Sequence, residues 1–448
     1  MKPLKFLITA LLLSFLGYAQ VEDRFFSLEE AQAYALKNSY SVVDRRLELE
    51  KAKQTIRETR ASGLPQVTAS AQYTNNIQIQ GQPVKAQVFD ASAPPDLIIY
   101  APFGVKNQTV ASISVNQLLF DGSYFVALQA SKVYEDIANL DVNKSEIEIR
   151  SSISTAYYTV LIAREARVLA EENLEVIKKN YSEVKALYDN GFVEEQDVDQ
   201  LELLSNNVSN QLNNAQRQEL YIKQLLMVAL GMPLEGDIVL TDSLDDMMEL
   251  STNESLLNEA GISVEDHIDY RIVSNNNRAA TLQLKNEKAM YLPRVSGFLQ
   301  HSQLNADDDN FNAFNYNTYW APGTSIGFGV EWSLFTGLAR SARVQKAEID
   351  LDRTEVAMKA TNDQIRVNYA RARSNYLFAL DNLETQKKNM DISRKIRDKT
   401  LIKYREGISS SLDLTQAENQ NLEAQQNYLN ALQNLLNTKE ELILAIGK

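Results

Sequence analysis

The sequence predicts a fold of mixed α and β structure that is mainly α, built as two copies of one pattern. Its 448 residues include 16 Gly and 9 Pro, about 5.6% together against roughly 12% in average proteins, so helices can run for long stretches. The glycines are also regularly spaced: gaps of 69 and 40 residues recur as gaps of 70 and 40, counted through Gly122, Gly191 and Gly231 and through Gly337, Gly407 and Gly447. Four further segments alternate polar and apolar residues, as β-strands do.

The regular spacing indicates a tandem duplication, because matched residues accompany it. The motif Leu119–Gly122 recurs as Leu334–Gly337. From Arg150 onward the matched residues keep a single offset of 216 positions over about 80 residues, among them Tyr188 with Tyr404 and Asp197 with Asp413. We therefore divide the chain into a first repeat at 20–232, a connecting segment at 233–260 and a second repeat at 261–448.

The first 19 residues have the features of a secretory signal peptide. Lys2 and Lys5 flank an apolar stretch that ends at Leu16, and Gly17 and Ala19 supply the small residues of a cleavage site. The apolar stretch is too short to span a membrane. The sequence therefore predicts export of the mature chain.

The first repeat reads as a helix, two strands and a long helical hairpin. Ser27 is a suitable N-cap, and Glu30 completes a capping box three residues later. Pro65 ends this helical segment, because it disfavours helical geometry at the preceding residue and supplies no N–H. Alternation then predicts strands at about 66–80 and 109–120, joined by a loop with several prolines.

The second repeat follows the same order, with strands expected at about 294–304 and 324–336. After Gly122 and Gly337 come helical stretches of some 68 residues, each about 100 Å long. Turns at Gly191 and Gly407 reverse them into returning helices. Apolar residues at heptad spacing form two adjacent seams on the last helix, which predicts contacts with two neighbouring helices, as in a closed ring. An ordinary long coiled coil is the alternative for these helices taken alone.

The composition excludes several classes of function. The chain has no Cys, which excludes disulfide scaffolds and thiolate chemistry, and its formal net charge of −14 argues against nucleic-acid binding. Its two histidines, His267 and His301, are expected at a helix start and in a strand. Asp307-Asp308-Asp309 lacks the Gly and Glu of a calcium loop. We predict no catalytic residue, metal site or cofactor, and no enzymatic activity.

The four strands suit an outer-membrane β-barrel. Each is long and one-sided, as expected for a strand with an apolar face toward lipid and a polar face toward a lumen. Four strands are too few to close a barrel, so subunits must associate.

At this point the sequence resembles the TolC family of outer-membrane efflux proteins, over essentially the whole mature chain. The resemblance rests on the duplicated plan and on two turn motifs, Tyr188-Asp189-Asn190-Gly191 and Tyr404-Arg405-Glu406-Gly407. It implies a homotrimer in the outer membrane of a Gram-negative bacterium, extending into the periplasm. Four strands per subunit would form a twelve-stranded barrel in outer-membrane lipid, above a long periplasmic α-helical barrel with an equatorial belt that includes residues 232–260 and the C-terminus.

The resemblance also implies a function and its partners. Such a trimer is the exit duct of a tripartite efflux or type I secretion system, and it docks a periplasmic adaptor and an inner-membrane pump. The turns at Gly191 and Gly407 would contact the adaptor. The alternative is a structural periplasmic coiled-coil protein without channel activity, which would explain the helices but not the strands. Drugs, metals and proteins are all cargoes of such ducts, and the sequence leaves the choice open.

In this family a constriction at the periplasmic end opens like an iris. Links among a Tyr, an Asp and an Arg hold it shut, and Tyr404 and Asp197 match the first two, whereas Ser409 stands at the Arg position. Asp413 matches an acidic ring that would make the constriction cation-selective, with Gln416 at the place of a second ring. Asp197 and Asp413 also suit the first turns of helices as capping residues, and the two roles are compatible.

Overall fold

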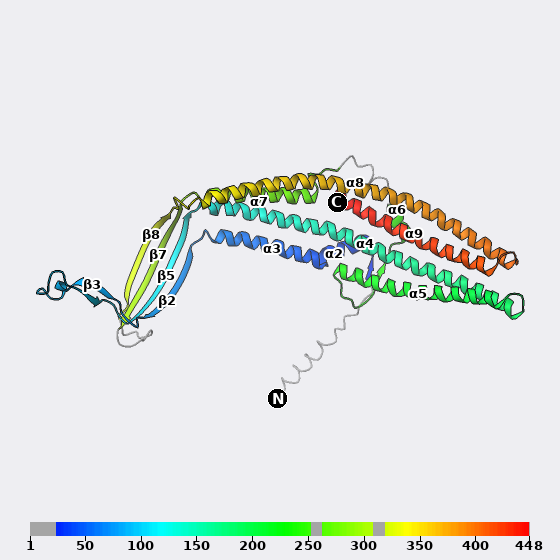
Figure 1. Ribbon diagram of the computed structural model, residues 1–448, viewed down its shortest axis with the longest axis horizontal. Helices are drawn as coiled ribbons and strands as arrows, with labels where there is room; N and C mark the ends of the chain where they lie inside the picture. Colours follow the sequence, from blue (N-terminus) through cyan, green and yellow to red (C-terminus); the bar gives the residue numbers. More distant parts are fainter. Residues whose placement is uncertain (1–23, 252–261, 308–318, 448) are drawn as a thin grey trace, which may run out of the picture. The chain divides into compact units, whose positions relative to one another are not determined.

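The computed structural model describes residues 24–251, 262–307 and 319–447 (Figure 1). The signal peptide expected at 1–19, most of residues 252–260 of the connecting segment, and Asp308 and Asp309 lie outside the described residues. The chain divides into two units, each treated by itself below. The sheet unit comprises residues 50–136 and 275–355, and the helical unit comprises 1–49, 137–274 and 356–448.

The sheet unit is built on four antiparallel strands that lie side by side in Figure 1. Their order is β2 (Gln66–Asn75), β5 (Asn107–Phe120), β7 (Arg294–Asp307) and β8 (Ala321–Glu331). The two strands of each repeat are thus neighbours, and β5 joins the repeats by pairing with β7. In this sheet β2 and β8 are the edge strands.

Register places the polar and apolar residues of the strands on opposite faces of the sheet. Thr68 pairs with Ser114 and Ser70 with Ser112, and each pair of hydroxyls is hydrogen bonded, at 2.7 and 2.8 Å. The residues between them, such as Val67, belong to the other face because successive side chains alternate. That face is exposed in the single chain: Val67 is 66% exposed and Ile326 of β8 is 82% exposed.

Two of the expected strand ranges are wrong at their ends. The first was expected at 66–80, but β2 ends at Asn75, where alternation is broken. The N–H of Asn76 donates to the Lys106 carbonyl at 2.7 Å, and the chain leaves the sheet. The fourth was expected at 324–336, but β8 covers 321–331. Trp332 lies beyond it, with its indole N–H donating to the Tyr291 carbonyl at 3.0 Å.

A separate hairpin occupies the connection between β2 and β5, where the sequence indicated only a loop with prolines. It consists of β3 (Gly81–Lys85), a short 3₁₀ turn η2 (Ala86–Val88) and β4 (Ile98–Pro102). Figure 1 shows it beyond the ends of β2 and β5.

The helical unit contains two long hairpins and the short elements that pack on them. In the first, α4 (Gly122–Asp189) turns into α5 (Glu195–Leu230), and in the second α8 (Ala339–Arg405) turns into α9 (Ser411–Ile446). α4 and α8, like α3 (Tyr40–Ala61) and α7 (Ile268–Ala289), run through both units. The other elements are β1 (Arg24–Phe26), α2 (Leu28–Asn38), β6 (Ile238–Leu240) and α6 (Leu244–Ser251).

Local signals account for these helices. The capping box predicted at Ser27 is confirmed, since the Ser27 N–H donates to Glu30 Oε2 at 2.9 Å and the Glu30 N–H donates to Ser27 Oγ at 3.3 Å. The helical segment before Pro65 is interrupted at Ser39, so it forms α2 and α3 instead of one helix. The long helices contain no proline. Among the described residues, no helix is both long enough and apolar enough to cross a membrane.

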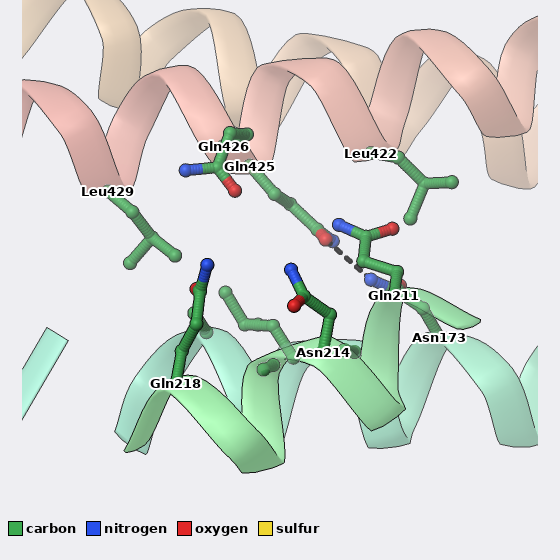
Figure 2. Close-up of a pocket in the computed structure, with 12 residues that line it drawn as sticks. Asn173, Gln211, Asn214, Gln218, Leu422, Gln425, Gln426 and Leu429 are labelled. Atoms are coloured by element: carbon green, nitrogen blue, oxygen red, sulfur yellow. Dashed lines mark hydrogen bonds between the residues drawn. The ribbon is translucent and has the colours of Figure 1, made fainter. Parts of the chain in front are cut away.

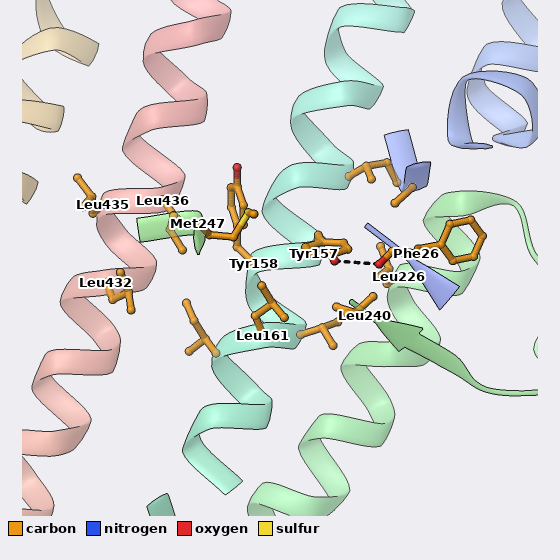
Figure 3. Packing of buried hydrophobic residues seen from close by; sticks show 14 of the residues in the cluster. Phe26, Tyr157, Tyr158, Leu161, Leu226, Leu240, Met247, Leu432, Leu435 and Leu436 are labelled. Carbon is orange, nitrogen blue, oxygen red and sulfur yellow. Dashed lines mark hydrogen bonds between the residues drawn. The ribbon is translucent and has the colours of Figure 1, made fainter. Parts of the chain in front are cut away.

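The main core of the helical unit lies where both hairpins meet β1 and β6 (Figure 3). Tyr157 and Leu161 of α4 pack with Leu226 of α5, Leu240 of β6 and Leu432 of α9, all nearly fully buried. The Tyr157 hydroxyl donates to the Phe26 carbonyl at 2.9 Å, which anchors β1 on the long helix. The heptad seam read on α8 is buried at Ala372, Tyr376, Ala379 and Leu383, as expected for helices with neighbours along their length.

Candidate functional site at the hairpin tips

Both hairpins turn at a glycine with a positive φ. Gly191 has φ +77° and Gly407 has φ +71°, and nothing lies within 4 Å of the position where a Cβ would be. In each turn the glycine N–H donates to the tyrosine carbonyl three residues before it, at 2.8 Å for Gly191 and 3.0 Å for Gly407. The two turns are therefore built alike, and both are exposed.

Asp197 lies in the first turn of α5 and connects the two hairpins. Its Oδ2 accepts the Glu194 N–H at 3.2 Å, so it caps its own helix as the sequence allowed. Its Oδ1 accepts a hydrogen bond from the hydroxyl of Ser411, the first residue of α9. The same hydroxyl lies 2.9 Å from Oε1 of Gln200. One serine of the second repeat thus meets two side chains of the first.

Tyr404 lies near the end of α8 and is half-buried. Within the described part of the chain its hydroxyl is buried and makes no hydrogen bond, so the expected link to Asp197 is absent from this chain by itself. The two side chains are still electrostatic neighbours. Burial, and then the negative charge of Asp197, raises the pKa of the Tyr404 phenol.

Asp413 and Gln416 lie three residues apart in the first turns of α9, and both are exposed. Asp413 Oδ2 accepts the N–H of Ser410 at 3.0 Å and its hydroxyl at 2.8 Å, and it accepts the Ser409 hydroxyl at 3.1 Å. These hydrogen bonds, led by the Ser410 N–H, hold the pKa of Asp413 below its ordinary value. Ser409 therefore binds Asp413 and not Asp197.

A second connection between the hairpins was not predicted. Arg405, the last residue of α8, donates to Glu183 Oε2 of α4 from Nη2 at 2.9 Å and from Nε at 3.1 Å. Both side chains are partly exposed. Ser411 was also missed, although the run Ser409-Ser410-Ser411 just before an acidic third residue is a helix N-cap signal. No local signal pairs Arg405 with Glu183, because the two residues are 222 positions apart.

Apolar residues of all four helices support the tips. Ile177 and Val184 of α4, Leu201 of α5 and Leu414 of α9 are buried together, and Leu401 and Tyr404 of α8 pack against them. The polar contacts of Asp197 and Arg405 therefore lie at the end of a packed cluster.

Farther along the hairpins, α4, α5 and α9 enclose a cavity of about 320 Å³ (Figure 2). Amide side chains dominate its wall: Asn173, Gln211, Asn214, Gln218, Gln425 and Gln426. Asn173 Nδ2 donates to Gln425 Oε1 at 2.6 Å across it. The cavity walls carry no charge. Among the described residues, no group of three or more His, Asp or Glu side chains is placed to bind a metal.

A four-stranded antiparallel sheet, combined with two long helical hairpins that are connected at their tips, defines an outer-membrane channel protein of TolC-like fold. The chain belongs to the outer membrane efflux protein family, whose sequence pattern it matches over residues 33–232 and 274–448. It is therefore a protein of the Gram-negative outer membrane. A comparison with curated proteins gave no match.

Solved structures share the fold over nearly the whole chain. CusC, described in a study of its folding and transmembrane channel formation, is 16% identical with a TM-score of 0.74, and the match covers 97% of this chain and 95% of that one. VceC from Vibrio cholerae is 18% identical with a TM-score of 0.68, covering 94% and 96%. CmeC, an outer-membrane channel from Campylobacter jejuni, is 18% identical with a TM-score of 0.68, covering 94% and 85%.

Proposed function

We propose that three copies of this chain form an exit channel of a tripartite efflux or type I secretion system. Cargo would pass from a periplasmic adaptor and an inner-membrane pump through the lumen by passive conduction. The observation that carries this proposal is the sheet, which has two free edges and an exposed apolar face in the single chain.

The free edges require partners. In a closed barrel β8 of one copy would pair with β2 of the next, which satisfies the backbone groups that an edge leaves open. The face that holds Val67 and Ile326 would then contact lipid, and the face with the hydroxyl pairs of Thr68 and Ser70 would line the lumen. The long hairpins would extend into the periplasm, where the turns at Gly191 and Gly407 would contact the adaptor.

The channel reading and the structural coiled-coil reading give different results on extraction. A channel should be extracted from outer membranes by detergent as a trimer that withstands mild dodecyl sulfate and dissociates on heating. Its far-ultraviolet circular dichroism should contain a β component beside the helical signal. A chain released without detergent as a monomer, with no β signal, would rule out the channel.

We further propose that the tips are a periplasmic gate, with Asp197, Tyr404, Asp413 and Gln416 at the constriction. Two contacts support a closed state within one subunit, Ser411 with Asp197 and Arg405 with Glu183, because each joins the two hairpins. A hydrogen bond to a charged group contributes about 1.5–3 kcal/mol. An exposed ion pair contributes about 0–1 kcal/mol, so the serine contact should dominate.

The gate can be tested by planar-bilayer recording of the purified trimer. Ser411→Ala, and separately Asp197→Ala combined with Tyr404→Phe, should raise the conductance of the closed channel, because each removes groups that hold the hairpins together. Asp199→Ala is the matched control, since it removes one exposed carboxylate two residues from Asp197 on another side of α5. Unchanged conductance in both test variants would contradict the gate assignment.

A further inference from the structure

The hairpin of β3 and β4 distinguishes the two repeats. It lies in a connection of 31 residues, 76–106, whereas the matching connection of the second repeat, 308–320, has 13. Five residue pairs join its strands, from Gly81 with Pro102 to Lys85 with Ile98. It is a two-stranded sheet of its own, not an extension of the four-stranded sheet.

The hairpin exposes a large apolar surface. Ile98 is 58% exposed and Tyr100 is 75% exposed, and they share one face of β4 because they are two residues apart. Phe89 stacks on Phe103 with ring centroids 5.9 Å apart, and both rings remain mostly exposed. An apolar surface of this kind on a small element indicates an interaction site.

The prolines of the hairpin restrict how it can associate. Pro83 lies within β3 and Pro102 ends β4, and neither can donate a ladder hydrogen bond. Addition of another strand at an edge is therefore disfavoured. The face of Ile98 and Tyr100 is left as the surface for packing.

Charge selects among the possible occupants of this face. Residues 76–106 contain Lys85, Lys106, Asp90 and Asp96, a net charge of zero in a chain whose net charge is −14. An anionic lipid surface would require a cluster of basic residues, which this segment lacks. Three uncharged hairpins can approach one another around a threefold axis without repulsion.

We propose that the occupant is a second copy of this chain: the apolar faces of the three hairpins pack on one another and form a collar across the outer mouth of the channel. This inference rests on the proposed function, because the hairpin leaves β2, the edge strand that would meet β8 of the next copy. Burial of Ile98, Tyr100 and Phe89 would stabilise the collar, and its apolar contacts would have to separate for cargo to leave.

The absence of cysteine in the chain allows a direct test. Ile98→Cys, expressed in the full chain in outer membranes, is treated on intact cells with a membrane-impermeant bis-maleimide. We expect a covalent dimer that contains about two of every three chains, because such a reagent joins only two of three cysteines around a threefold axis. Adding Tyr100→Lys to this variant should abolish the dimer by placing charge in the contact.

Gln82→Cys is the matched control, because Gln82 is exposed on the opposite face of the same hairpin. A dimer from Ile98→Cys but not from Gln82→Cys would support the collar. No dimer from Ile98→Cys, or equal dimer from both, would overturn it if the heat-dissociated trimer band is present, and the proposed channel would stand. Loss of that band from the unsubstituted chain would overturn both.

Discussion

At the scale of single residues, Glu418 has an unusual environment for a carboxyl group. It lies on α9, it is only 2% exposed, and Oε1 makes no hydrogen bond within the described part of the chain. Burial raises its pKa to about 7, and Arg397 of α8 partly opposes this effect while Asp398 adds to it. Its counterpart in the first repeat, Glu202, is exposed and accepts a hydrogen bond from Tyr181 at 3.3 Å.

Glu418 should make the stability of the helical unit depend on pH. Its folded pKa of about 7 exceeds the ordinary 4.5, so its contribution is fully present below pH 4.5 and is lost as the pH rises to about 7. The loss should be on the order of 3 kcal/mol, because one pKa unit corresponds to about 1.4 kcal/mol. Thermal melting of the trimer in detergent, followed by circular dichroism from pH 4.5 to 8, measures it.

Glu418→Gln should flatten that pH profile, because a neutral amide cannot ionise. Glu202→Gln is the matched control in the other repeat and should leave the profile as it is. If the profile of Glu418→Gln matched that of the unsubstituted chain, ionisation of Glu418 would not be its source.

At the scale of elements, the two tip turns depend on backbone conformation alone. Gly407 has a positive φ and no neighbour that a Cβ would strike. Gly407→Ala should therefore cost roughly 1–2 kcal/mol, the penalty of a left-handed conformation for an ordinary residue. Hydrogen exchange of the first-turn amides of α9, measured by mass spectrometry, should rise accordingly.

Gly407→Asn provides the comparison, because asparagine adopts this conformation more readily than alanine does. The same pair of substitutions at Gly191 should act on α5. If alanine and asparagine had equal effects, backbone strain would not explain the turn.

The elements also show what the sequence could and could not predict. The long helices, their turns and the order of the strands follow from proline, glycine and alternation, which are local signals. The end of β2 at Asn75 depends on a hydrogen bond to Lys106 across the next connection, and the hairpin of β3 and β4 was hidden by its prolines. Such pairings join distant residues and leave no local pattern.

The candidate site was predicted in part, for the same reason. Asp197 and Asp413 were found because the duplication marks them, and both cap their helices. The partner of Asp197 is Ser411, which the 216-residue offset pairs with Glu195 and not with another serine. Contacts between the repeats are not duplicated, so the repeat pattern does not reveal them.

At the scale of the whole molecule, three copies of Asp413 would form an acidic ring in the proposed trimer. Its lowered pKa keeps it ionised at neutral pH, so the ring should favour cations. Asp413→Asn should bring the ratio of cation to anion permeability towards unity, since asparagine still accepts the capping hydrogen bonds. Reversal potentials in a potassium chloride gradient measure the ratio.

Asp199→Asn controls for the loss of one carboxylate per subunit elsewhere on the tip. It should leave the reversal potential unchanged. Equal shifts in the two variants would mean that total charge, and not a ring at Asp413, sets ion preference.

The matched lengths of the helices have a consequence for how such a chain can change over time. α4 has 68 residues and α8 has 67, while α5 and α9 have 36 each. An insertion in one hairpin alone would move its tip out of register with the other and separate Asp197 from Ser411. Insertions and deletions should therefore survive only in pairs, one in each repeat, and in whole heptads that preserve the apolar seams.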